Sequence, residues 1–147
     1  MKTKEIRTAI EIQAKKDKVW EVLTNFKEYP KWNPFIQTIE GSLKLGGKLK
    51  VKIVPPHSKG MVFKPNIIDL EKNRKFTWLG HFLFKGLFDG QHTFELIENN
   101  DGTTTLIQSE IFKGLLIPLF GKKFEDNTKA GFRLMNASLK EKIEVSE

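Results

Sequence analysis

The side chains that could exchange protons near neutral pH are few in this chain. They are the three histidines, His57, His81 and His92, because histidine is the side-chain type that titrates most readily in this range. His92 shares the alternating phase of Phe94 and Leu96, and alternate residues of a strand point to the same face. We therefore expect His92 to face the interior, where an imidazole could act as a general acid or base.

A carboxylate is predicted to lie opposite this histidine. Residues 91–98 alternate, 99–102 are turn formers and 103–112 alternate again, which predicts a β-hairpin. Closure of the turn at Asn100 and Asp101 pairs Leu96 with Leu106, Phe94 with Gln108 and His92 with Glu110. Paired side chains lie about 4.5–5.5 Å apart at Cβ. The histidine and the glutamate could thus orient each other for proton transfer to a bound substrate.

A purely structural pair is the alternative interpretation. Buried polar groups commonly satisfy each other's hydrogen bonds, and a slip of one residue would turn both side chains outward. His57 follows two prolines in a predicted loop, and His81 is out of phase with Trp78 and Phe82, so both are expected at the surface. Since the chain has no cysteine and no closely spaced histidines, we predict no metal and no cofactor.

The first third of the chain must supply one strand and short helical pieces. Residues 4–14 alternate, which predicts a strand, and Asp17 is expected as the N-cap of a short amphipathic helix. Two prolines in 29–35 predict an irregular, aromatic-rich connection. A strand over 36–39 and another over 48–54 then form a hairpin across Gly46-Gly47.

Further strands and one long helix complete the prediction. Strands are expected over 61–71 and 74–84, and a turn over 86–90 leads from the second of them into the hairpin described above. The helix is the final element, of about 25 residues, because apolar residues recur there at helical spacing: Phe132, Met135, Leu139 and Ile143. Small residues also occur in this helix, namely Ala130, Gly131, Ala137 and Ser138. A glycine inside a helix costs about 1 kcal/mol relative to alanine, which indicates a packing reason. Ala137 is expected on the wall that faces the sheet.

The order of these elements is that of a helix-grip fold: an α+β protein with a curved antiparallel sheet of about seven strands around a long C-terminal helix and two short helices after the first strand. The chain resembles the superfamily of START lipid-transfer domains, birch-pollen-allergen-like proteins and polyketide cyclases and dehydrases (SRPBCC), in its bacterial single-domain form. The strings that carry the resemblance are Ile10–Ala14 with Lys18–Leu23, Tyr29–Phe35, Phe76–Trp78, His92–Leu96 and Glu110–Pro118.

This resemblance implies an internal cavity for a hydrophobic or amphipathic small molecule, such as a lipid, a sterol or a polyketide. With the strand phases, it predicts a ligand site lined by Trp78, His92, Phe94, Gln108, Glu110 and Met135. The first functional hypothesis is a non-catalytic binder or carrier. The second is a cyclase, aromatase or dehydratase in which His92 and Glu110 shuttle protons. The third is an interaction module that uses the lysine-rich surface.

Composition and charge limit the partners. The chain has 147 residues and is expected to form one domain over 1–147. Of its 25 basic residues, 22 are lysine, whereas nucleic-acid recognition favours arginine, and lysines alternate with apolar residues over 48–53 as on a solvated strand. We predict no specific nucleic-acid partner, weak contact with anionic membranes that is lost near physiological salt, and a monomer or weak dimer. The charged start and the lack of a long apolar stretch predict a cytoplasmic protein without a transmembrane segment.

Overall fold

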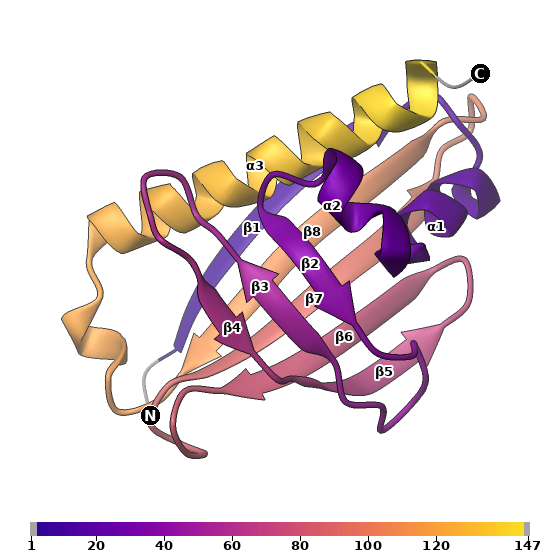
Figure 1. Ribbon diagram of the computed structural model, residues 1–147. Helices are drawn as coiled ribbons and strands as arrows, with labels where there is room; N and C mark the ends of the chain where they lie inside the picture. Colours follow the sequence, from indigo (N-terminus) through magenta and orange to yellow (C-terminus); the bar gives the residue numbers. More distant parts are fainter. Residues whose placement is uncertain (1–2, 146–147) are drawn as a thin grey trace.

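The computed structural model of the protein describes residues 3–145. These residues form two antiparallel sheets and a long helix that lies across them (Figure 1). The larger sheet has the order β1 (Thr3–Ile12), β8 (Thr104–Lys113), β7 (Asp89–Glu98), β6 (Lys75–His81), β5 (Asn66–Glu71). The smaller sheet has the order β2 (Ile36–Glu40), β3 (Lys50–Ile53), β4 (Met61–Phe63). The helices are α1 (Lys16–Thr24), α2 (Tyr29–Trp32) and α3 (Lys122–Val145), with 3-10 turns η1 (Phe26–Glu28) and η2 (Ile117–Leu119).

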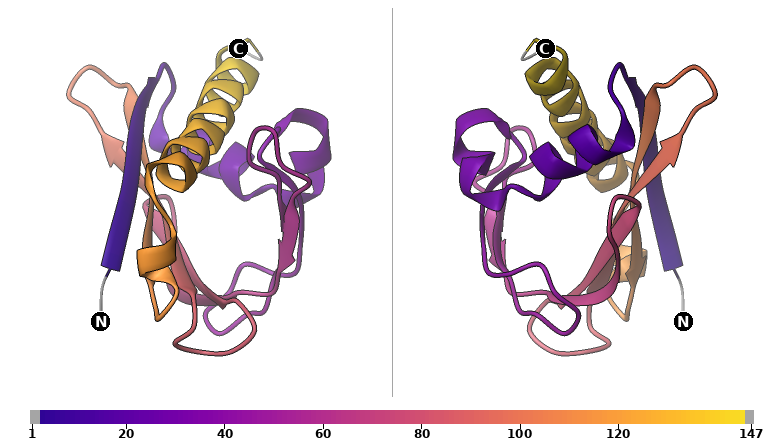
Figure 2. Two further views of the ribbon diagram at one scale, coloured as in Figure 1. Left: turned by 90° about the vertical axis from the view of Figure 1, so that its left-hand side faces the viewer. Right: turned by 90° about the vertical axis from the view of Figure 1, so that its right-hand side faces the viewer.

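The two sheets face each other, and α3 closes the space between them along one side (Figure 2). The predicted α+β helix-grip architecture is therefore confirmed, with eight strands within residues 3–145 where about seven were expected. The register of the central hairpin is also confirmed, because His92 pairs with Glu110 and Phe94 with Gln108. The inner face of the larger sheet thus carries the side chains that the alternation predicted.

Two predictions about the limits of helices and strands were wrong. Asp17 is not the N-cap of α1: Lys15 holds that position, and Asp17 lies in the first turn, where its carboxylate accepts the Lys18 N–H at 2.9 Å. An acidic residue in the first turn still stabilises the positive end of the helix dipole.

The predicted strand over 61–71 is the second correction, because it is two strands in different sheets. Pro65 separates β4 from β5 and has no N–H for a ladder bond. At this break the chain passes from the smaller to the larger sheet. The Leu49 N–H donates to the Pro65 carbonyl at 2.9 Å, and Lys48 forms a bridge with Asn66. The two sheets are thus joined at the point where the strand breaks.

The inward face of α3 is the predicted one. Phe132, Met135, Leu139 and Ile143 are fully buried against the larger sheet. Gly131 has the expected packing reason, since a Cβ atom there would overlap the ring of Phe35. Ala137 does not lie on the inner wall as predicted. It is exposed on the outer side of the helix, because the residues that face inward in this turn are Met135, Asn136 and Leu139.

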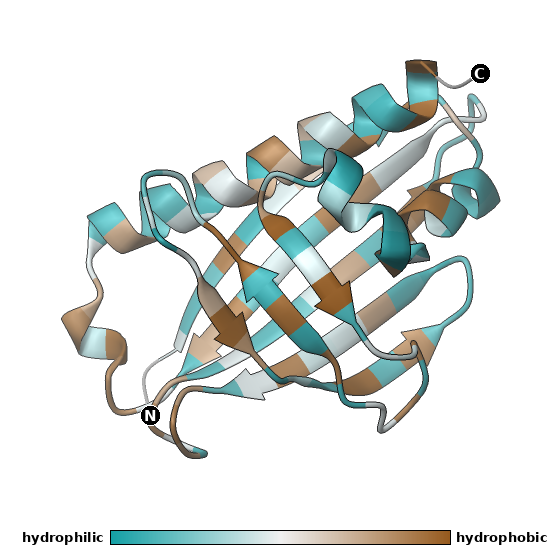
Figure 3. Ribbon diagram, in the orientation of Figure 1, coloured by the Kyte–Doolittle hydropathy of each residue, from teal (hydrophilic) through white to brown (hydrophobic). Residues whose placement is uncertain are grey.

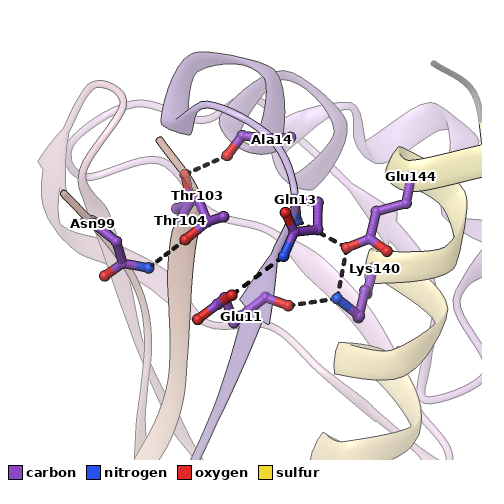
Figure 4. Close-up of polar contacts among 8 residues, drawn as sticks. All are labelled: Glu11, Gln13, Ala14, Asn99, Thr103, Thr104, Lys140 and Glu144. Carbon is purple, nitrogen blue, oxygen red and sulfur yellow. Dashed lines mark hydrogen bonds and ion pairs between the residues drawn. The ribbon is translucent and has the colours of Figure 1, made fainter. Parts of the chain in front are cut away.

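The C-terminal half of α3 is fixed to the end of β1 (Figure 4). The Glu144 carboxylate accepts the Gln13 N–H at 2.8 Å and the Lys140 ammonium at 2.6 Å, and Lys140 also donates to the Glu11 carbonyl at 2.8 Å. The hydrogen bond from Lys140, followed by that from Gln13, lowers the pKa of Glu144. These contacts hold the end of α3 on the sheet while its first turns extend over the space between the sheets.

Candidate functional site

A cavity of about 340 Å³ lies between the two sheets, under the first turns of α3. This volume lies at the lower end of the range of about 300–1,000 Å³ that is typical of small-molecule sites. Most of the lining side chains are apolar. The larger sheet supplies Trp78, Gly80, His81, Gly90, Glu110 and Phe112; the smaller sheet, Val51, Ile53, Met61 and Phe63; the connections, Phe35, Pro55, Ser58, Pro65, Phe82, Phe88, Leu116 and Phe120; and α3, Phe124 and Thr128.

A pair of glycines explains why the space is empty at this place. Phe76, Trp78 and Gly80 follow one another along the inner face of β6, and they pair with Phe94, His92 and Gly90 of β7. The first two pairs fill the core with rings, whereas the Gly80–Gly90 pair adds no side chain. Aromatic rings at such positions would occupy the cavity. The absence of side chains from two neighbouring strands therefore determines where the cavity begins.

Of the six residues predicted to line the ligand site, Trp78 and Glu110 line this cavity. The other four do not: His92, Phe94, Gln108 and Met135 are fully buried in the core behind it. The cavity thus lies further along β6 and β7 than the predicted site, by one inward-facing residue pair, towards Gly80 and Gly90. The strand phase was right, but phase alone does not tell which inward positions are covered by other side chains.

His92 is held between aromatic rings. Its imidazole centroid lies 4.7 Å from that of Phe94, 5.0 Å from that of Phe132 and 5.1 Å from that of Trp78. The side chain has no exposed surface. Its two ring nitrogens are both used, since Nε2 lies 3.0 Å from Gln108 Oε1 and Nδ1 lies 3.3 Å from Glu110 Oε1. The surrounding rings and the two polar contacts together hold the imidazole in a single orientation.

A chain of buried hydrogen bonds leads from this histidine to α3 and β1. The Gln108 side-chain amide donates to Asn136 Oδ1 at 2.7 Å, and the Asn136 amide donates to Thr8 Oγ1 at 2.8 Å. The Thr8 hydroxyl in turn donates to the backbone carbonyl of Gln108 at 3.2 Å. A backbone carbonyl can only accept, so this last bond fixes the direction of all the others.

The direction of the chain determines where the protons are. Gln108 donates through its amide, so its Oε1 must accept, and His92 Nε2 must carry a hydrogen. In a neutral imidazole of this form Nδ1 is an acceptor, as is a carboxylate oxygen. A hydrogen bond between His92 Nδ1 and Glu110 Oε1 therefore needs a hydrogen on one of these two atoms. Through this contact the Glu110 side chain, which lines the cavity, is linked to the buried chain of hydrogen bonds.

Gly90 provides the space for the Glu110 carboxylate. A Cβ atom at Gly90 would lie 2.5 Å from Glu110 Oε2, closer than atoms tolerate. The Glu110 side chain is 13% exposed, and Oε1 is the oxygen that contacts His92. Any larger residue at Gly90 would displace the carboxylate from this place. The sequence carries a signal for this role, since an isolated glycine in a strand pattern often marks a close approach. The predicted turn over 86–90 does not include this role, because Gly90 lies in β7.

Four phenylalanines that the sequence analysis did not assign to the site close one end of the cavity. Phe88 stacks on Phe112 with centroids 5.3 Å apart and packs on Phe120 at 4.8 Å. Phe124 lies 4.7 Å from Phe120 and 5.3 Å from Phe112. The spacing of Phe120 and Phe124 would place both on one helix face. Their meeting with Phe88 depends on how the β8–α3 connection folds back over the sheet.

The fold and the cavity define a helix-grip protein, and the sequence comparison agrees. The chain belongs to the family described as polyketide cyclase/dehydrase and lipid transport, whose model matches residues 3–144. No curated protein matches the chain. Within residues 3–145, no helix has the length and apolar character needed to span a membrane.

Solved structures with the same fold include proteins of several kinds. A START superfamily protein from Mycobacterium smegmatis has a TM-score of 0.77 at 14% identity, over 97% of this chain and 99% of that one. The protein Ara h 8.0201 has a TM-score of 0.75 at 16% identity, over 99% and 100%. A point mutant of norcoclaurine synthase from Thalictrum flavum, in complex with a transition-state analogue, has a TM-score of 0.70 at 15% identity, over 99% and 96%. At these identities the likeness establishes the fold.

Proposed function

We propose that this protein binds a hydrophobic or amphipathic small molecule in the cavity between the two sheets. The observation that carries the proposal is an apolar space of about 340 Å³ with the Glu110 carboxylate in its wall. A concave, mostly apolar surface with few polar groups is typical of small-molecule sites. The family description, which names lipid transport, supports the same function.

The polar side chains of the wall narrow the chemistry of the ligand. Glu110 can accept a hydrogen bond through Oε2, and His81, held by Asp89 at 2.8 Å, lies at the edge of the cavity. The remainder of the wall consists mainly of aromatic and aliphatic side chains. The best ligand is therefore a largely apolar molecule with one hydroxyl, amine or protonated end that can donate to Glu110.

Substitution of Thr128 by phenylalanine is expected to reduce the uptake of a hydrophobic fluorescent probe, 1-anilinonaphthalene-8-sulfonate, by about tenfold or more. Thr128 is buried and lines the cavity from α3, so the added ring occupies space that the probe would use. Fluorescence titration measures the affinity. Thermal unfolding verifies that the variant is folded.

The matched control is Ala137→Phe on the same helix. Ala137 is exposed on the outer face, so the same ring should leave probe affinity within about twofold of the parent. Equal loss in both variants would show that the probe binds elsewhere. Unchanged affinity in the folded Thr128→Phe variant would contradict ligand binding in this cavity.

A second function, catalysis of the cyclase or dehydratase kind, is favoured by one specific observation. His92 Nδ1 lies 3.3 Å from Glu110 Oε1, and Glu110 lines the cavity. In this alternative Glu110 would exchange a proton with the substrate, and His92 would act as a positioning residue behind it. A relative with this fold, norcoclaurine synthase, is named as an enzyme.

The catalytic alternative can be tested without its natural substrate. The ring of 5-nitrobenzisoxazole opens when a base removes its C3 proton: the C–H bonding pair forms the nitrile and the N–O bond breaks to give the phenolate. General-base catalysis contributes about 100-fold or more, so Glu110→Gln should lower the rate by at least about tenfold. The exposed Glu98→Gln is the control. Equal rates for Glu110→Gln and the parent protein would speak against the catalytic function.

A further inference from the structure

Apolar side chains are exposed at the tips of two connections at one end of the molecule. Leu83 is 78% exposed and Phe84 is 61% exposed in the β6–β7 connection. Leu115 is 71% exposed and Leu119 is 77% exposed in the β8–α3 connection. The hydropathy colouring shows both connections as largely hydrophobic at this end (Figure 3). These four side chains are called the loop-tip surface below.

The two connections form one surface because their backbones are bonded together. The Leu115 N–H donates to the Gly86 carbonyl and the Leu116 N–H to the Leu87 carbonyl, both at 3.1 Å. Gly114 makes this approach possible, since it has a φ of 138° and a Cβ atom there would overlap the Leu87 carbonyl. The four exposed side chains are thus held on one support.

The backbone conformation of Leu83 is unfavourable for a leucine, and the side chain is exposed. Its φ is 64°, in the left-handed region where glycine or asparagine is less strained than a branched apolar residue. Folding does not offset this cost by burying the side chain, which is largely exposed to water. Strain at an exposed apolar residue points to a role that is fulfilled only when a partner covers it.

The surroundings of the loop-tip surface are positively charged. Segments 82–88 and 113–124 contain four lysines, Lys85, Lys113, Lys122 and Lys123, and no acidic residue. All four lysines are exposed. The carboxylates that flank these segments are already engaged: Asp89 accepts the Gly86 N–H at 3.0 Å and lies 2.8 Å from His81, Glu125 accepts from the Lys4 ammonium at 3.0 Å, and Asp126 lies 3.3 Å from Lys122. The field around the apolar tips therefore favours an anionic partner.

The same two connections also line the cavity. Phe82 and Phe88 of the first connection, and Leu116 and Phe120 of the second, are part of its wall. Apolar side chains thus continue from the cavity wall to the exposed tips. A hydrophobic ligand that dissolves in a bilayer would contact apolar side chains all the way from the exposed tips to the cavity.

We propose that the loop-tip surface docks on anionic lipid bilayers, with Leu83, Phe84, Leu115 and Leu119 inserted among the acyl chains and the four lysines at the headgroups. Projecting apolar tips with a lysine border fit the bilayer interface, where apolar insertion and attraction to anionic lipid add together. Charge alone predicts weak contact that salt removes, whereas insertion of apolar side chains is not screened. Docking does not depend on what the cavity binds, because vesicle binding is measured without a cavity ligand.

Co-sedimentation with vesicles of three parts phosphatidylcholine to one part phosphatidylglycerol tests the docking. The protein should bind these vesicles, keep measurable binding at about 150 mM salt and bind pure phosphatidylcholine at least about tenfold more weakly. The double variant Leu83→Asn, Leu119→Gln should bind the mixed vesicles at least about tenfold more weakly than the parent. The control is Ile97→Gln, Leu134→Gln, which removes two exposed apolar residues elsewhere and should remain within about twofold.

A fluorescence measurement reports insertion directly. Phe84→Trp should show a blue-shifted emission with the mixed vesicles and quenching by brominated acyl chains, while Leu134→Trp on the outer face of α3 should show neither. The proposal is overturned if the parent protein does not bind the vesicles, or if the loop-tip variant binds as well as the parent. It is also overturned if the loop-tip substitutions instead abolish a concentration-dependent dimer in sedimentation velocity, which would identify the surface as a contact between two copies.

Discussion

Replacement of Phe76 by alanine is expected to lower the free energy of unfolding by about 3–5 kcal/mol, the range found for large aromatic residues removed from a core. Phe76 has no exposed surface. Its ring lies 4.9 Å from that of Phe94 and 5.8 Å from that of Trp20. The side chain therefore joins the larger sheet to α1, and its loss leaves a void that neighbouring strands cannot fill by moving.

Urea unfolding followed by circular dichroism measures this loss. Phe84→Ala is the matched control, because Phe84 is 61% exposed and exposed substitutions usually change stability by about 0.5 kcal/mol or less. If Phe76→Ala cost no more than this control, the aromatic core would not be the main source of stability at the junction between α1 and the sheet.

Replacement of Gln108 by leucine is expected to destabilise the protein by about 2–5 kcal/mol, although the two side chains are similar in size. The substitution leaves two buried groups without their hydrogen-bond partner: the Nε2–H of His92 and the side-chain oxygen Oδ1 of Asn136. Each buried polar group without a partner costs about 1–3 kcal/mol. The backbone carbonyl of Gln108 still accepts from Thr8, so the effect isolates the side chain.

The same unfolding measurement on Gln37→Leu provides the comparison. The Gln37 amide makes one exposed contact, to the Pro34 carbonyl at 3.4 Å, and its loss should change stability by about 0.5 kcal/mol or less. A loss below about 1 kcal/mol for Gln108→Leu would mean that the buried chain is not an essential part of the core. The position of the His92 imidazole would then need another cause.

The local sequence pattern was sufficient to predict the central hairpin and the long helix of the fold. The alternation of 91–98 and 103–112 around one turn gave the pairing of His92 with Glu110, because a two-stranded hairpin has few registers once the turn and the buried face are known. The spacing of Phe132, Met135 and Leu139 gave the inward face of α3 for a similar reason. Both are periodic properties of a continuous stretch of chain, and the structure has both as predicted.

Interruptions of a pattern were more difficult to interpret. Pro65 lies in a stretch that alternates on both sides, so 61–71 was predicted as one strand. The sequence does not show that the chain changes sheets there. Gly90 was likewise grouped with a turn, although it lies in β7 opposite Gly80. A single proline or glycine breaks the local pattern without telling what the rest of the chain places beside it.

The amino-acid sequence by itself thus determined which side chains point inward, since phase depends only on neighbours along the chain. It could not decide which of those inward side chains border an empty space. That depends on the pairing of Gly80 with Gly90, on the smaller sheet that faces them and on Phe120 and Phe124, which arrive from the β8–α3 connection. Only the tertiary structure placed Trp78 and Glu110 at the cavity and His92 and Gln108 behind it. A cavity is volume that several distant segments leave unfilled, and no single segment encodes it.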